Sequence, residues 1–493
     1  MDTQKIGSAC AMTAVERNRA NKKAEHKVWR RRVRKEITHR KGKPLLTMAM
    51  IRKLKYYTNP LEQLIIILNN CFPWLLKSLS KLSDIRNQSY TDYEMQEITL
   101  IRLLALCCGI QSMAEIKTKL NREEFIYNIN QILNTNLKGF PCDDTISNVI
   151  NMIKVEELER LQCSLIKKLI ESKTLDKYRL FNGSFYIVID GTGLFSTRKN
   201  LGKGCIYKVH NKGTDTEYTQ YQYYVLEAKI VCKNYVFSFA TEFVENENMS
   251  SEKDKQDCEL KAAHRLLSKI RKLFPKLPIT IGADALYVNK PFMDACKEHK
   301  MDYILRYKDT VMTTINEEFK VIEKTVIENY EYVNFIEFGS GTKKTEGQTN
   351  IIKYICPPKQ TVKNSSKPID TAIITGGTEF TYITSLKITN ANYAEIVLFG
   401  RRRWKIENQG FKDQKSRVLN IEHCYTFDND GTKVNYYFIQ IAHALLTILY
   451  YGSAIIKQLH ETKVEVASLL YQAMIKYQPL DLGLDQGFQI RFD

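Results

Sequence analysis

Apolar residues recur three and four positions apart from Leu45 to about Lys177, for example in EEFIYNINQIL and VEELERLQCSLIKKLIES. This spacing places apolar side chains on one face of a helix, where they can be buried against a neighbouring element. The pattern therefore predicts an all-helical region over residues 45–178.

The pattern changes at Phe185 to alternating or continuous apolar runs, namely FYIVIDGTG, YQYYVLEAKIVCKN and YVFSFATEFV. Runs of this kind, separated by turn residues, are typical of consecutive strands of one sheet. An amphipathic helix over Lys253–Phe274 follows, and ITIGAD and DYILRY then predict two further short strands. Residues 179–309 are therefore expected to form an α/β unit.

Residues 310–386 are rich in Thr, Val, Ile, Tyr and Gly, and their alternation and Gly turns predict a β-rich insertion. A helix is expected next, within residues 387–430, and a long helical pair within residues 431–493. The apolar stretch Phe438–Ile456 contains polar interruptions, whereas a membrane span needs about 20 predominantly apolar residues. This stretch predicts a buried core helix, and no membrane is expected as a partner.

Charge points to a partner. The chain has 73 Lys and Arg against 55 Asp and Glu, a formal net charge of +18. Such a balance attracts a polyanion, and nucleic acid is the leading candidate, with simple solubility as the alternative explanation. The densest basic block runs from Arg17 to Lys43, and blocks of this kind are usually tails, so residues 1–44 are expected to form a basic flexible arm.

The cysteines favour a reducing compartment. Twelve cysteines occur at irregular positions without any CxxC, and the start MDTQKIGSACAM lacks the apolar stretch of a secretory signal. Free thiols in the cytoplasm are the expectation. The sequence Glu422-His423-Cys424 has no second ligand pair at a suitable spacing, so zinc is not expected there.

Three acidic residues stand in contexts that suit one site. Asp190 ends the run FYIVID, Asp284 ends ITIGAD, and Glu407 lies in the helical segment RRRWKIENQ. Two carboxylates from strand ends and one from a helix can converge on a pair of divalent cations, as phosphodiester chemistry requires. The order of elements is that of an RNase H-like α/β domain, in which Asp190 would lie on the first, central strand and Asp284 on its neighbour.

Each of these residues also has an ordinary explanation. An Asp at a strand end often only forms a turn, and Arg403 with Glu407 would by themselves be an exposed helix ion pair. The three acids together, in this order, favour the catalytic interpretation. Other acids of the region are assigned to strand interiors and a helix face: Glu227, Glu242, Asp257, Glu259 and Asp309.

The chain resembles DDE-type transposases of bacterial insertion sequences, the cut-and-paste class with a β-rich insertion. The matching segments are IDGTG, IGADALYVNK and GRRRWKIENQGFKDQK, and the resemblance covers roughly Phe185 to Tyr425, about half of the chain. It implies an α/β RNase H-like (retroviral-integrase-like) catalytic domain with a β-rich insertion, flanked by all-helical N- and C-terminal regions. The implied organisation is a DNA-end-binding domain at 45–178, the first catalytic part at 179–309, the insertion at 310–386, the Glu-bearing helix at 387–430 and a C-terminal helical region at 431–493.

The third segment follows the pattern of this family with two departures. The family pattern is Tyr, two residues, Arg, three residues, Glu, six residues, Lys. Arg403 and Glu407 fit, whereas Gly400 takes the Tyr position and Gln414 the Lys position. At about 100° per residue of helix, Lys415 reaches the side of Glu407 and is the expected replacement.

The resemblance implies a chemistry and a set of partners. Asp190, Asp284 and Glu407 would be the catalytic residues and would hold Mg²⁺ as two ions, with Mn²⁺ as a substitute. Water would cleave the element ends, and the freed 3′-OH ends would be joined to target DNA. The protein would act as a homodimer on paired ends of double-stranded DNA. Its expected location is the bacterial cytoplasm, at the nucleoid. The expected DNA-binding residues are Arg403, Lys415, Arg198, Lys199 and Lys203.

Two alternatives come from other classes of protein. One is a catalytically degenerate DNA-binding protein that retains the basic and helical parts. The other is a host metal-dependent nuclease of the same fold, without transposition.

Overall fold

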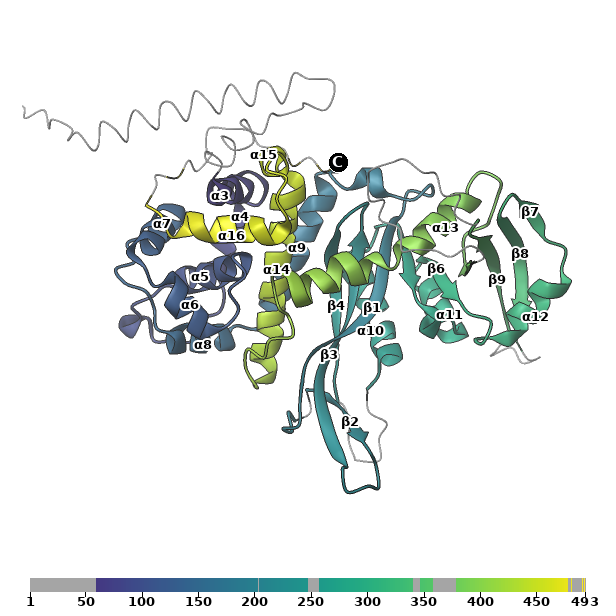
Figure 1. Cartoon of the computed structure of the whole chain (residues 1–493), viewed down its shortest axis with the longest axis horizontal. Coiled ribbons are helices and arrows are strands. Elements are labelled where there is room, and N and C mark those ends of the chain that lie inside the picture. Colours follow the sequence, from purple (N-terminus) through teal and green to yellow (C-terminus); the bar gives the residue numbers. More distant parts are fainter. Residues whose placement is uncertain are drawn as a thin grey trace, which may run out of the picture.

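The computed structural model describes residues 59–202, 204–246, 257–339, 346–357 and 378–477, together with residues 480, 490 and 492. The expected arm at residues 1–44 and the expected DNA-binding residue Lys203 lie outside the described residues. Figure 1 shows helices from both ends of the chain gathered beside a large twisted sheet.

The N-terminal region is helical, as predicted. Local capping begins several of its helices: Asn59 Oδ1 accepts from the backbone N–H of Leu61 at 3.0 Å, and Ser112 Oγ accepts from that of Glu115 at 3.1 Å. The elements are α3 (Pro60–Cys71), α4 (Trp74–Leu79), η1 (Gln88–Tyr90), α5 (Met95–Cys107), α6 (Met113–Leu120), α7 (Glu123–Leu133), α8 (Asp143–Met152), α9 (Val155–Glu171) and η2 (Asp176–Tyr178).

The strands form one mixed sheet in the order β2-β3-β1-β5-β6-β10-β9-β8-β7, with β4 also paired to β3. The pairs β1–β5 and β5–β6 are parallel, and the other pairs are antiparallel. The strands are β1 (Phe185–Thr197), β2 (Ile206–His210), β3 (Tyr218–Val231), β4 (Val236–Val244), β5 (Ile279–Ala283), β6 (Asp302–Tyr307), β7 (Thr325–Ile327), β8 (Tyr330–Phe338), β9 (Gly347–Ile355) and β10 (Glu379–Thr384). The predicted adjacency of the strand that carries Asp190 and the strand that leads to Asp284 is confirmed.

The segment predicted to be β-rich extends this sheet. Strand β10 pairs antiparallel with β6, and β9, β8 and β7 continue outward from it. The segment also contains a helix, α12 (Thr313–Val321), which packs on β8 at one end of the molecule (Figure 1). The region between residues 310 and 386 therefore continues the sheet that carries the acids.

Side chains alternate between the two faces of β1, and a different helix covers each face. Ile187 and Ile189 belong to the cluster that contains Leu266 of α10, whereas Val188 belongs to the cluster that contains Phe399 of α13. Asp190 has the same parity as Val188, so it lies on the α13 side. The elements around these faces are α10 (Glu259–Leu273), η3 (Ala285–Tyr287), α11 (Lys290–Glu298) and α13 (Tyr393–Arg402).

The segment that carries Glu407 is not the regular helix expected from the sequence. After α13 the chain forms two π-helical pieces, η4 (Ile406–Phe411) and η5 (Asp413–Arg417). A π-helix has i→i+5 hydrogen bonds and is wider than an α-helix, so the angle of about 100° per residue does not hold here. The regular α-helix assumed in placing Lys415 beside Glu407 is therefore wrong.

A buried polar network fixes the π-helical segment against the sheet. Lys229 and Glu227 of β3 are both fully buried and form an ion pair. Lys229 Nζ donates to Gln414 Oε1 at 3.2 Å, and Gln414 Nε2 donates to Gln440 Oε1 at 2.6 Å. Gln440 and Tyr436 then donate to Glu227 Oε1 at 3.0 and 2.6 Å. This network joins β3, η5 and the long helix that follows.

That long helix is α14 (Asn429–Gly452), followed by α15 (Ala454–Lys457) and α16 (Lys463–Met474). Helix α14 is buried along most of its length and packs against α5 and α9, so the predicted core helix is confirmed. Within the described residues, no helix has both the length and the apolar character needed to cross a bilayer.

The buried pair predicts a large effect of a single substitution. Lys229→Met should lower the free energy of unfolding by about 3–5 kcal/mol, because Glu227 would keep a buried charge without its partner. Urea denaturation followed by circular dichroism measures this. Lys117→Met is the matched control, since the ion pair of Lys117 with Asp143, at 3.2 Å, is exposed to solvent and its loss should change the free energy of unfolding far less. Equal losses in the two variants would contradict the assignment.

Candidate active site

Asp190 lies within β1, and Asp284 directly follows β5, the parallel neighbour of β1. The pairing of β1 with β5 runs from Phe185 opposite Ile279 to Val188 opposite Gly282, and the same offset places Asp190 opposite Asp284. The expectation that Asp190 ends its strand is wrong, because β1 continues to Thr197 as the partner of β3. Strand β5 instead ends at Ala283, the residue before Asp284. Its pairing with β1 therefore stops before Asp190.

Each of these carboxylates is oriented by a backbone N–H of its own segment. Gly191 N–H donates to Asp190 Oδ1 at 3.0 Å, and Leu286 N–H donates to Asp284 Oδ1 at 2.8 Å. Asp284 thereby caps the short helix η3. Each carboxylate accepts this bond with its Oδ1 atom. The bond fixes the orientation of the side chain relative to the backbone.

Glu407 reaches the same place from the covering segment, and Arg403 lies between the acids. Arg403 Nη1 is 3.5 Å from Asp190 Oδ2 and 3.5 Å from Glu407 Oε1. The Asp190 side chain is 18% exposed, whereas that of Glu407 is 56% exposed. The structure therefore brings Asp190, Arg403 and Glu407 together at the end of the β1–β5 pairing, where Asp284 also lies.

The site carries an excess of negative charge. Burial raises the pKa of Asp190 to about 7, and the charges of Glu407, Asp284 and Glu259 act in the same direction. The Arg403 guanidinium opposes this shift without cancelling it. A carboxyl group with a raised pKa beside other carboxylates marks a place that favours an added cation.

The donor chemistry suits a hard divalent cation, because carboxylate oxygens are the ligands that Mg²⁺ and Mn²⁺ prefer. Among the residues that the structure describes, no group of three or more His, Cys, Asp or Glu is placed to hold a metal ion. Arg403 bridges Asp190 and Glu407 and supplies the positive charge instead. Carboxylate oxygens of Asp190 and Glu407 thus lie on either side of one guanidinium.

The two departures from the family pattern have structural reasons. A Cβ on Gly400 would lie 2.6 Å from the Tyr382 ring, so this ring from β10 fills the space that a larger side chain would need. Gln414 is fully buried in the polar network and does not face solvent. Lys415 is 29% exposed, and its Nζ lies 2.7 Å from Glu422 Oε1.

Arg198 and Lys199 do not join the acids. They directly follow β1, eight and nine residues beyond Asp190, which corresponds to roughly 26–30 Å along an extended chain at about 3.3 Å per strand residue. Both are exposed, and each packs on an aromatic ring: Arg198 on Tyr218 at 4.4 Å and Lys199 on Phe427 at 4.5 Å. Tyr218 belongs to β3, whose hairpin with β2 projects from the body of the molecule (Figure 1).

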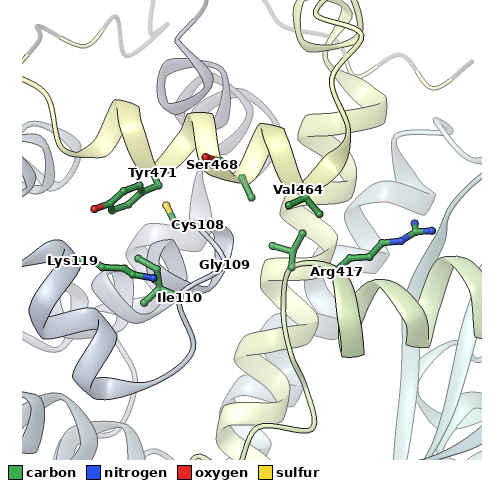
Figure 2. A pocket seen from close by; sticks show the side chains of 10 residues that line it. Cys108, Gly109, Ile110, Lys119, Arg417, Val464, Ser468 and Tyr471 are labelled. Atoms are coloured by element: carbon green, nitrogen blue, oxygen red, sulfur yellow. The ribbon is translucent and has the colours of Figure 1, made fainter.

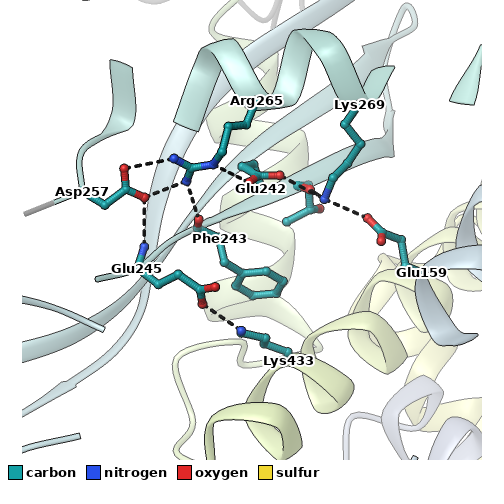
Figure 3. A network of polar contacts seen from close by, with 9 residues as sticks. Glu159, Glu242, Phe243, Glu245, Asp257, Arg265, Lys269 and Lys433 are labelled. Atoms are coloured by element: carbon teal, nitrogen blue, oxygen red, sulfur yellow. Dashed lines mark hydrogen bonds and ion pairs between the residues drawn. The ribbon is translucent and has the colours of Figure 1, made fainter. Parts of the chain in front are cut away.

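The contacts of Glu242 fit the structural role that the sequence predicts for it. Arg265 Nε lies 2.7 Å from Glu242 Oε1, and Lys269 Nζ lies 3.0 Å from Glu242 Oε2. Arg265 also binds Asp257 at 2.6 Å, and Lys269 binds Glu159 of α9 at 3.1 Å (Figure 3). This network fastens α10 to the end of β4 and to α9.

Glu259, assigned from the sequence to a helix face, lies beside the candidate site. Its carboxylate accepts hydrogen bonds from Tyr224 Oη at 2.9 Å and from Tyr287 Oη at 2.5 Å. A Cβ on Gly191 would lie 2.6 Å from Glu259 Oε2. No local sequence signal marks this residue, since it follows Asp190 by 69 positions and its neighbours are set by the sheet order.

A separate pocket of about 260 Å³ lies where the end of α5, α6, η5 and α16 meet (Figure 2). Its two cations are already neutralised: Lys119 binds Glu115 at 2.8 Å and Arg417 binds Asp413 at 2.6 Å. The lining contains none of the candidate acids, so this pocket is not part of the site.

Two protein families match parts of the chain. Residues 249–445 match the Transposase DDE domain, and residues 76–166 match the DDE_Tnp_1-associated family. Together these stretches make up more than half of the chain. The chain belongs to the DDE transposase family. Members of this family carry out DNA transposition and typically use divalent metal ions. The DDE match contains Asp284 and Glu407 of this transposase, whereas Asp190 lies before it.

Two other comparisons are less informative for the transposase. No curated protein matches its sequence at a significant level. Among solved structures, piggyBac transposase in a synaptic complex with hairpin DNA is similar to it with a TM-score of 0.41 and 10% sequence identity, over 84% of this chain and 80% of that chain.

The raised pKa of Asp190 predicts how stability depends on pH in the metal-free transposase. Because the folded pKa of about 7 exceeds the ordinary value of 3.8, the contribution of Asp190 to stability is complete below pH 4 and is lost as the pH rises through 7. Asp190→Asn should therefore gain melting temperature relative to wild type between pH 5 and pH 8, measured in EDTA. The exposed Asp215→Asn should show no such gain. A constant difference between Asp190→Asn and wild type at both pH values would refute the shift.

Proposed function

We propose that this transposase binds the ends of an insertion sequence, cleaves them by metal-dependent phosphodiester hydrolysis and joins the 3′-OH ends to target DNA. The observation that carries the proposal is the position of Asp190 on β1 and of Asp284 directly after the parallel neighbour β5, with Glu407 joined to Asp190 through Arg403. Two strand-borne carboxylates and a third from a helix-like segment form the ligand arrangement that this chemistry uses.

The finer assignment of the fold is an RNase H-like catalytic domain. The order β4-β3-β1-β5-β6, with the first three strands antiparallel and the last three parallel, supports it. In this proposal β7–β10 are the insertion into the catalytic domain. The proposed boundaries are 45–178 for a DNA-end-binding domain, 179–309 and 387–430 for the catalytic domain, 310–386 for the insertion and 431–493 for the C-terminal region.

Asp190, Asp284 and Glu407 are the proposed catalytic and metal-binding residues. Mg²⁺, as two ions in this proposal, would activate the attacking oxygen and stabilise the leaving oxygen when bound. In the first step water attacks the phosphorus at the element end, the P–O3′ bond breaks, and a 3′-OH and a 5′-phosphate remain. In the second step the 3′-OH attacks a target phosphodiester, a new P–O bond forms, and the target 3′-oxygen leaves.

The basic residues have separate tasks in this proposal. Arg403, which bridges Asp190 and Glu407, is near enough to bind a phosphate of the cleaved strand. Lys415 lies on the same segment and is half-buried beside Glu422. The exposed Arg198 and Lys199 are placed to bind the phosphate backbone farther along the DNA. A homodimer on paired ends follows from the family resemblance.

Metal-dependent end cleavage tests the catalytic assignment. With a DNA fragment that carries the flanks of the gene, wild type should cut at the element boundary in Mg²⁺ or Mn²⁺. Asp190→Asn and Glu407→Gln should each lose at least about 100-fold in rate, because a ligand charge is removed while the volume is kept. Glu298→Gln, an exposed acid of α11, is the control and should cleave like wild type.

Other results would select other functions. End binding by wild type without cleavage in either metal would indicate a catalytically degenerate DNA-binding protein. Nicking that ignores the element boundary would indicate a general nuclease.

Salt dependence of DNA binding tests the proposed role of Arg198 and Lys199. Lys199→Ala should weaken binding to element ends and to unrelated DNA alike, and should reduce the slope of log K against log[salt] by about 1. Fluorescence anisotropy across a salt series measures both quantities. Lys276→Ala, an exposed lysine in the turn after α10, should leave the slope unchanged. A loss of affinity without a change of slope would argue against a phosphate contact.

A further inference from the structure

The two acid-bearing segments continue past the point where the sheet holds them together. The last β1–β5 pair is Val188 with Gly282, so no ladder position joins Asp190 to Asp284. Strands held by a ladder keep a fixed spacing of about 4.8 Å, and beyond its end another contact must set the distance. The carboxylate of Glu259 lies at this gap.

We propose that Glu259 is a positioning residue that holds the segments of Asp190 and Asp284 at the spacing needed for a shared metal site. Its Oε2 accepts from Tyr224 Oη at 2.9 Å, and its Oε1 accepts from Tyr287 Oη at 2.5 Å. Tyr224 belongs to β3, on one side of β1, and Tyr287 lies three residues after Asp284, on the other side. The Glu259 carboxylate therefore crosses the face of β1 opposite Asp190 and connects β3 with the segment that follows β5.

Gly191 provides the space for this link. It is the residue after Asp190, and its missing side chain would point to the face opposite Asp190, where α10 packs. A Cβ there would lie 2.3 Å from Tyr224 Oη and 2.6 Å from Glu259 Oε2. Close approach of Glu259 to the β1 backbone is thus possible only with a glycine at this position.

The link is rigid at both ends. Glu259 is the first residue of α10, and the same helix is fastened to β4 about two and three turns later through Arg265 and Lys269 (Figure 3). Tyr287 is fully buried and packs on Phe292 with ring centroids 5.0 Å apart. Burial and the nearby Glu259 charge raise the pKa of both tyrosine hydroxyls, so they remain protonated and donate.

Glu259 acts through the tyrosines in this proposal and is not itself a metal ligand. The inference rests on the proposed function, because the site that it positions is the proposed metal site. Residues that support ligands from outside the coordination sphere typically change metal affinity or activity by about 10–100-fold when removed. The same range is expected here.

The test compares four full-length proteins: wild type, Glu259→Ala, Glu259→Gln and the double variant Tyr224→Phe/Tyr287→Phe. The Mn²⁺ concentration for half-maximal end cleavage should rise about 10–100-fold in Glu259→Ala and in the double variant. Glu259→Gln should stay within about threefold of wild type, because an amide can accept from one hydroxyl and donate to the other.

Two measurements that do not require cleavage accompany the titration. The rise in melting temperature on adding Mn²⁺ should be smaller in Glu259→Ala and in the double variant, since a weaker site stabilises less at the same concentration. Binding of element-end DNA in EDTA should equal that of wild type. Glu298→Ala is the control for loss of a carboxylate from a helix and should behave like wild type throughout.

The outcomes separate this inference from the proposed function. An unchanged Mn²⁺ midpoint in Glu259→Ala overturns the inference. A Glu259→Gln variant as impaired as Glu259→Ala, together with an unimpaired double variant, also overturns it, because the charge of Glu259 would then act on the site without the tyrosines. If Glu259→Ala does not fold, the double variant decides. If wild type cleaves in no metal, the proposed function fails, while the Mn²⁺-dependent melting shift still tests Glu259.

Discussion

The parallel pairing of β1 with β5 is the constraint on which the site depends. Its register sets Asp190 level with Asp284, although 93 residues separate them in the chain. Parallel strands send their carboxyl ends to the same edge of a sheet, so both side chains emerge at one place. Every other feature of the site, including the Arg403 bridge and the Glu259 link, is built around this shared edge.

The cost of gathering carboxylates there is electrostatic. Burial and neighbouring negative charge raise the pKa of Asp190, and Arg403 compensates only in part. The remainder of the structure supplies the rigidity that keeps these like charges together. A buried network on Lys229 and Glu227 holds the segment of Glu407 on one face of the sheet, and an ion-pair network on Arg265 holds α10 on the other.

These two networks differ in how they work. The Lys229 network is fully buried and joins β3 to η5 and α14, so solvent does not reach its members to replace a lost partner. The Arg265 network is partly exposed, with 38% of the arginine side chain accessible to solvent, and it gains from several carboxylates around one guanidinium. The first network specifies a single position for the π-helical segment, and the second stiffens an element that stands behind the acids.

Much of the architecture could be predicted from local pattern. Helical periodicity before residue 178, the strand runs after Phe185 and the core helix near Phe438 each follow from which residues must be buried. The three acids could also be selected, since each stands at the end of an apolar run or on a helix beside an arginine. Their joint interpretation came from their order along the chain, and the matched DDE domain spans Asp284 and Glu407.

The sequence by itself determined the elements, the order in which they occur and the chemical character of the acids, because these depend on residue types and short-range spacing. Only the tertiary structure decided the rest. The length of β1 beyond Asp190, the π-helical form of the Glu407 segment, the burial of Gln414 and the place of Glu259 all depend on partners distant in the chain. Local pattern records whether a side chain is buried, whereas contacts across the sheet decide which side chain it meets.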